Sequence, residues 1–147
     1  MKPFSLNTVL KHRKNLEDQA MYRLVKAREE ENQAQRQLQE DELILATLLE
    51  TFSREQSQGI EVVRLARFEQ RIPLLEKQVM TSQLLLQKKK EGATRAQEQL
   101  ISKSKDRKIM ETLQQKQDAS WRQYLSRKET ATLDEVAVIF HNREPDR

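Results

Sequence analysis

The side chains that could carry out chemistry are few and far apart in this sequence of 147 residues. His12 and His141 are the two histidines, and neither has a neighbouring cysteine, a serine elbow or the spacing of a zinc-binding helix. The absence of cysteine excludes disulfides and thiolate metal sites. The two glycines, Gly59 and Gly92, cannot build a phosphate-binding loop. We therefore expect no catalytic residue, no metal site and no cofactor, and we expect that the chain is not an enzyme.

Clustered basic residues are the other group that could bind a ligand. The lysines at 88–90 and the basic cluster at 103–108 could contact phosphates, which makes a basic coiled-coil nucleic-acid-binding protein one alternative function. No aromatic residues alternate with these lysines and no recognition motif accompanies them, so we favour a solvated helix face and expect no nucleic-acid partner.

The charge is distributed unevenly around a net value of +4. Residues 29–42 contain six acids and one base, whereas residues 85–128 contain twelve bases and five acids. This asymmetry suits two antiparallel helices that attract each other, and equally a basic rod that meets an acidic partner.

The composition favours long helices over a globular core. Charged residues make up 34% and aromatic residues 5%, with only 2 glycines and 3 prolines, so large apolar side chains are too few to fill a core. No apolar run approaches the roughly 20 residues that a membrane span needs. The first residues lack the apolar stretch of a secretory signal. We therefore expect a cytoplasmic protein.

Apolar residues recur at alternating steps of three and four in both halves of the chain, as in a coiled coil. The first ladder is interrupted by Glu31 and Asp41, and it otherwise contains Leu24, Ala27, Ala34, Leu38, Leu45, Leu48 and Phe52. The second ladder is interrupted by Ser82, Lys89, Lys103 and Arg107, and it otherwise contains Leu65, Phe68, Ile72, Leu75, Val79, Leu86, Ala93, Ala96, Leu100, Met110, Trp121 and Tyr124. Each ladder predicts one long helix with a narrow apolar stripe.

A polar segment ending at Gly59 separates the ladders, and glycine suits the position after a helix because it adopts positive φ. We predict an all-α antiparallel coiled-coil hairpin in a single domain over 1–147, with helices at about 5–56 and 60–140, a turn at about 57–59 and a tail at 141–147. Pro73 is a second break, where the later helix bends or begins, but the in-phase ladder favours a start near Ile60. Without the turn, two chains would pair in parallel as a structural rod.

The two predicted helices differ in length, about 78 Å against about 120 Å at 1.5 Å per residue. The N-terminal end of the first helix then lies opposite about residue 112. The part of the second helix that follows this position has no helix beside it. This part carries an apolar stripe, which predicts a docking surface for another protein. Its members are Leu113, Trp121, Tyr124, Leu125, Leu133, Val136, Ile139 and Phe140.

Three short motifs follow one another along the chain. They are Phe4-Ser5-Leu6 with Val9-Leu10 and Arg13; Gly59-Ile60 with Phe68, Leu75-Glu76-Lys77 and Val79; and Arg127-Lys128-Glu129 with Leu133-Asp134-Glu135-Val136-Ala137. Over essentially the whole chain, these motifs resemble the FliJ family of flagellar export proteins, whose near relatives are the stalk proteins of virulence secretion systems. Pro73 departs from the family pattern.

The resemblance implies a non-enzymatic stalk or adaptor of a bacterial flagellar type III export apparatus. Such a protein inserts into a hexameric export ATPase, promotes its assembly, and links it to the large cytoplasmic component of the export gate and to export chaperones. The implied location is cytoplasmic, peripheral at the inner membrane through partners only. A virulence type III secretion stalk protein is the alternative in the same class.

The resemblance also implies two sets of contact residues. The ATPase-ring set combines both ends of the chain: Leu6, Leu10, Arg13, Trp121, Tyr124, Lys128, Leu133, Asp134, Glu135 and Val136. The gate and chaperone set lies toward the turn: Leu45, Leu48, Leu49, Phe52, Phe68, Ile72 and Leu75. Packing alone would explain most of the second set, because these residues lie on the ladders, whereas Leu49 does not.

Overall fold

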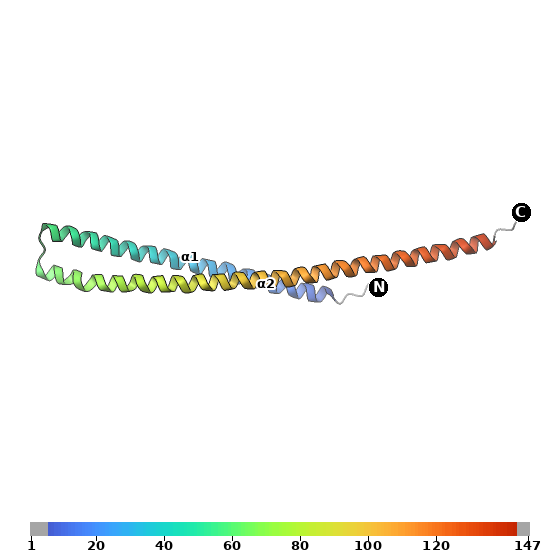
Figure 1. The fold of residues 1–147 in the computed structure, drawn as a ribbon, viewed down its shortest axis with the longest axis horizontal. Helices are drawn as coiled ribbons and strands as arrows, with labels where there is room; N and C mark the ends of the chain where they lie inside the picture. Colours follow the sequence, from blue (N-terminus) through green and yellow to red (C-terminus); the bar gives the residue numbers. More distant parts are fainter. Residues whose placement is uncertain (1–5, 144–147) are drawn as a thin grey trace. The chain divides into compact units, whose positions relative to one another are not determined.

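The computed structural model describes residues 6–143, and these residues form two long α-helices and no strand. Helix α1 spans Leu6–Gln58 and helix α2 spans Val62–Arg143 (Figure 1). The predicted fold of two long packed helices, the second longer than the first, is confirmed. Each boundary at the turn lies two residues later than the sequence suggested, because α1 continues to Gln58 and α2 starts at Val62.

The chain divides into two compact units, which we describe separately. The hairpin unit is Asp18–Ile101 and contains the turn. Among the described residues, the terminal unit contains 6–17 of α1 and 102–143 of α2. Both helices contribute to both units.

In the hairpin unit, α1 and α2 run antiparallel and pack through the two ladders (Figure 1). The seam, meaning the line of ladder residues between the helices, includes the buried residues Leu24, Ala34, Leu38, Phe68, Leu86, Ala93 and Ala96. Ala34, Leu38 and Leu86 form one buried cluster with Val79 packed against it. Alanines at the seam let the helix backbones approach closely, so a stripe with few large side chains still excludes water.

The pairing of the helices follows one register. The residue numbers of two facing residues add to 120 for Phe52 and Phe68, whose rings pack in a tilted arrangement, and to 119 for Asp41 and Gln78. The sequence placed the turn near residue 58, whereas the two helices are joined by residues 59–61. Facing positions are therefore shifted by about three residues from the expected ones.

The turn is closed by backbone geometry and by one ion pair. Gly59 has a φ of 88°, and its N–H donates to the Gln56 carbonyl at 3.5 Å, a bond that glycine makes after a helix C-terminus. Arg64 donates two hydrogen bonds to the carboxylate of Glu55. The same guanidinium lies 5.9 Å from the ring centroid of Phe68. The ion pair therefore sits beside the aromatic pair and holds the first turn of α2 against the last turns of α1.

Pro73 lies within α2, and the helix continues through it. The proline ring removes one backbone hydrogen bond, but Pro73 is exposed, so water can reach the carbonyl that the ring leaves without a donor. Ile72 and Leu75 are half-buried at the seam on either side of the proline. Their packing keeps this stretch helical, as the in-phase ladder suggested.

Replacing Gly59 by alanine should lower the free energy of unfolding by about 1 kcal/mol, because an L-residue at this positive φ is strained. Backbone strain would be the cause, since a Cβ added at Gly59 meets no atom within 4 Å. Urea unfolding followed by circular dichroism measures the change.

Gly92 provides a matched control inside α2, where an added Cβ also meets no atom within 4 Å. Gly92→Ala should raise the free energy of unfolding by about 1 kcal/mol, since alanine favours the helix over glycine. Changes of the same sign in both variants would contradict the special role of Gly59.

Candidate interaction surfaces

In the terminal unit, the start of α1 packs on α2 largely through polar bonds. Arg107 Nε donates to Glu17 Oε2 at 2.7 Å, and Arg107 Nη1 lies 2.8 Å from Glu111 Oε2. The hydrogen bond from Arg107 lowers the pKa of Glu17, and the same bond raises the pKa of Arg107. Gln114 Nε2 donates to Asn7 Oδ1 at 2.7 Å. Charge and amide pairs therefore accompany the apolar contacts of Leu10 in this part of the seam.

The N-terminal members of the expected ATPase-ring set face α2 in this unit. Leu10 is buried and Leu6 is half-buried. Arg13 Nη1 lies 3.7 Å from Asp106 Oδ2. These side chains are engaged within the chain, so the structure does not place them on one exposed surface with the C-terminal members of the set.

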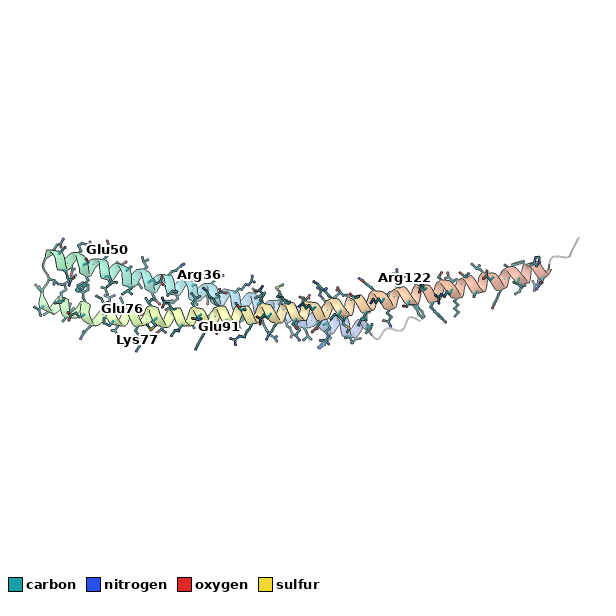
Figure 2. All side chains as sticks on the ribbon, viewed as in Figure 1. Arg36, Glu50, Glu76, Lys77, Glu91 and Arg122 are labelled. Carbon is teal, nitrogen blue, oxygen red and sulfur yellow. The ribbon has the colours of Figure 1, made fainter. Side chains whose placement is uncertain are left out.

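Beyond Gln114, α2 continues to Arg143, and every residue from Arg122 to Arg143 is exposed. Figure 2 labels Arg122, where this stretch begins, and shows the side chains projecting from α2 between there and its C-terminal end. Leu133 is 68% exposed and Val136 is 41% exposed. The stretch is therefore a helix whose apolar residues are not covered by the described part of the chain.

Four of these apolar residues lie on one face of α2. Val136, Ile139 and Phe140 lie within about 60° of Leu125 around the helix, at 100° per residue. We call these four residues the terminal stripe. Positions that would continue the seam, such as Lys128 and Glu135, are polar and flank the stripe on one side.

Trp121 immediately precedes the fully exposed stretch of α2. It is half-buried, and its ring stacks on Tyr124 with centroids 5.6 Å apart. Of the expected contact residues, Val136 lies on the terminal stripe and Leu133 at its edge, whereas Asp134 points to the opposite side, about 180° from Leu125. Leu125, Ile139 and Phe140 were part of the expected apolar stripe but not of the contact set. The heptad spacing of residues 125, 132 and 139 is the signal that identifies their face.

Most residues of the expected gate and chaperone set lie at the seam between α1 and α2. Phe68 is buried, whereas Leu49 is exposed. The other members are half-buried between the helices: Leu45, Leu48, Phe52, Ile72 and Leu75. Packing within the hairpin accounts for most of this set, and a partner would reach the exposed residues beside it.

One exposed flank of the hairpin unit lies beside these residues. Gln37 and Gln78 both donate to Asp41, so these two glutamines lie on the same side of the hairpin. The residues that line up with each of them along its helix form a column on that side. Residues at heptad and i+3/i+4 spacing from these glutamines share that side. They form what we call the neutral flank: Ile44, Thr47 and Thr51 on α1, and Leu74, Gln78, Thr81 and Leu85 on α2.

The seven residues of the neutral flank are uncharged, although Glu40 and Arg71 share its heptad columns. Ile44 is 46% exposed and Leu85 is 44% exposed. The hydroxyls of Thr51 and Thr81 donate to the carbonyls of Thr47 and Lys77, which leaves the methyl groups for contact. Sequence reasoning missed this flank because it considered only the ladder positions and not the columns next to them.

Within 6–143, no three acidic or histidine side chains converge in a way that could hold a metal ion. In the same range, neither helix contains a stretch that is apolar enough to cross a bilayer.

Two long packed helices with exposed apolar side chains define the class, a helical-hairpin protein. A family model described as "Flagellar FliJ protein" matches residues 1–146. The chain belongs to the FliJ family, as its motifs suggested, and is thus a flagellar, export-associated stalk protein of a non-enzymatic adaptor family. Comparisons with curated proteins and with solved structures found no match.

Replacing Glu17 by glutamine should destabilise the chain at neutral pH and have less effect in acid. A carboxyl whose folded pKa is lowered contributes stability above its ordinary pKa of 4.5, and this contribution is lost as the pH falls through the folded pKa. The difference in Tm between the parent chain and Glu17→Gln should therefore be positive at neutral pH and vanish in strong acid. Thermal unfolding across the pH range measures it.

The control is Glu50→Gln, since Glu50 is exposed on α1 in the hairpin unit. Its difference in Tm from the parent should be small at every pH. A difference for Glu17→Gln that does not change with pH would rule out the Arg107 bond as its cause.

Proposed function

We propose that this chain is the stalk of the flagellar export ATPase. In this proposal it inserts α2 into the hexameric ring, promotes ring assembly and links the ring to the export gate and the export chaperones. It acts in the cytoplasm, peripheral to the inner membrane through its partners, and binds no nucleic acid. The observation that carries the proposal is the terminal stripe, an apolar face on the exposed end of α2.

The terminal stripe is large enough to contribute to a specific contact. Full burial of an aliphatic or aromatic side chain contributes roughly 1.5–3 kcal/mol, so four such side chains can offset much of the cost of association. Lys128 and Glu135 flank the stripe with opposite charges, which suits a polar rim around an apolar centre. An isolated helix of this kind is suited to the inner surface of a protein ring.

The neutral flank is the surface that we propose for the gate and the chaperones. It lies beside the half-buried gate residues, and its exposed side chains need no desolvation of charge on binding. A partner helix could lie along the flank and contact both α1 and α2. Contacts at the two surfaces can then form independently, because the surfaces belong to different units of the chain.

Several basic side chains are used within the chain, which supports a protein partner over a nucleic acid. Lys89 Nζ lies 3.1 Å from Glu30 Oε2. Arg107 is paired with both Glu17 and Glu111. These pairs reduce the positive charge that the 88–90 and 103–108 clusters present to phosphates. Binding of duplex DNA at physiological salt would contradict this part of the proposal.

The direct test is to mix the purified chain with the export ATPase. We expect a larger fraction of hexamer by sedimentation and a higher ATPase rate. An unchanged oligomer size together with an unchanged rate would end the stalk proposal.

The double variant Leu133→Asp with Val136→Asp should lose most of the ATPase stimulation, at least about tenfold in apparent affinity, because it places two charges against an apolar contact. Circular dichroism should show unchanged helicity, since both residues are exposed. Titration of ATPase rate against chain concentration gives the affinity.

Val138→Asp is the matched control, an exposed valine about 140° around the helix from Leu125. It should retain the stimulation. Equal losses in the control and in the double variant would mean that no single face of α2 makes the contact.

A second pair of variants tests the neutral flank. Ile44→Asp with Leu85→Asp should abolish capture of the cytoplasmic gate component by the tagged chain and leave ATPase stimulation intact. Leu43→Asp with Leu84→Asp changes the exposed neighbours, one position around each helix, and should preserve capture. If both pairs capture the gate component equally well, the neutral flank is not its binding surface.

A further inference from the structure

Asp41 is the most deeply buried charged residue of the hairpin unit, with 3% of its surface exposed. Ser82 of α2 donates its hydroxyl to Asp41 Oδ2. Gln37 of α1 and Gln78 of α2 each donate to Asp41 Oδ1 at 3.1 Å. A carboxylate at a seam position is therefore held by three neutral donors, two of which come from the facing helix.

This arrangement is costly compared with an apolar seam residue. Removing a carboxylate from water carries a large penalty, which hydrogen bonds to neutral groups offset only in part. A leucine at the same position would pack against Leu38 and Val79 without that penalty. A contribution to the stability of the hairpin therefore does not explain why Asp41 stands at this position. The remaining role is to favour one pairing of α1 with α2 over other pairings.

The apolar ladders alone leave the pairing ambiguous. Both repeat every seven residues, so sliding α2 by one heptad along α1 still sets ladder against ladder. Asp41 would then lie beside Leu75 after a slip in one direction and beside Lys89 after a slip in the other. The first slip removes the Ser82 and Gln78 donors and brings Arg71 to the position of Gln78. Either slip separates Phe52 from Phe68, whose rings lie 5.0 Å apart in a tilted arrangement in the observed register.

Pairing with a second copy is the other alternative to the hairpin. In a parallel in-register dimer, each Asp41 would face the Asp41 of the second copy across the seam, and Glu31 would do the same. Two carboxylates at one layer repel each other, and no donor from the facing helix would satisfy either of them.

We infer that Asp41 and Ser82 form a register lock, which selects the observed hairpin over slipped hairpins and over self-association of the chain. Gln37 and Gln78 complete the lock by satisfying the second carboxylate oxygen. This role is independent of the proposed stalk function, because it concerns the pairing of α1 with α2 alone.

The variant Asp41→Leu tests the lock in the full-length chain. Two spin labels are attached through Arg36→Cys and Glu98→Cys, which are exposed and are the only cysteines present. A slip of one heptad shifts one label by about 10 Å along the hairpin relative to the other. The parent chain should give one narrow distance distribution by pulsed electron paramagnetic resonance. Asp41→Leu should add a second population, or form dimers in sedimentation as its concentration rises.

The Tm of Asp41→Leu should also rise, by at least about 3 °C, because a leucine replaces a buried carboxylate. Ser82→Ala should lower the Tm, because it leaves one carboxylate oxygen without its donor. If Asp41 only stabilised the hairpin, both substitutions would lower the Tm. A higher Tm for Asp41→Leu together with a lower Tm for Ser82→Ala therefore indicates that Asp41 selects the pairing.

Asp41→Asn is the conservative control, since its amide oxygen still accepts hydrogen bonds from the facing helix. It should retain one distance and remain monomeric. The lock is refuted if Asp41→Leu keeps a single narrow distance and stays monomeric, if it loses helicity, or if Asp41→Asn behaves like Asp41→Leu.

Discussion

The structure depends on one narrow contact, the seam between two antiparallel helices. The chain has few large apolar side chains, and the ladder places nearly all of its buried ones on one stripe of each helix. Small residues such as Ala34, Ala93 and Ala96 let the backbones approach, so dispersion contacts replace bulk. Because the seam uses only this stripe, the remaining surface of both helices is available for solvation and for partners.

Polar groups within the seam change its character along the chain. In the hairpin unit, the buried carboxylate of Asp41 is satisfied by groups from both helices. In the terminal unit, the Glu17–Arg107 pair and the Asn7–Gln114 pair accompany the apolar contacts. Such pairs are partly exposed and contribute less than apolar packing. The start of α1 is thus held by weaker and more salt-sensitive contacts than the middle of the hairpin.

The fold could be predicted because its causes are local. Alternating steps of three and four identified both helices, and Gly59 identified the turn. The ladder running in phase through Pro73 correctly outweighed the helix-breaking tendency of proline. The interaction surfaces were harder, because exposure depends on which face the other helix covers. Phe68 and Leu75 lie in the seam, as their ladder positions already indicated, whereas the common side of Ile44 and Leu85 follows only from the register of the two helices. The satisfaction of Asp41 likewise depends on groups that are distant in sequence.

The length of α2 beyond its contacts with α1 has a steric consequence for assembly. Every residue from Arg122 to Arg143 is exposed, so a protein that covers Leu125 and Val136 need not displace any described part of the chain. A single continuous helix can in this way be held by its own chain along one part of its length and be bound by another molecule along a second part, without either contact having to open.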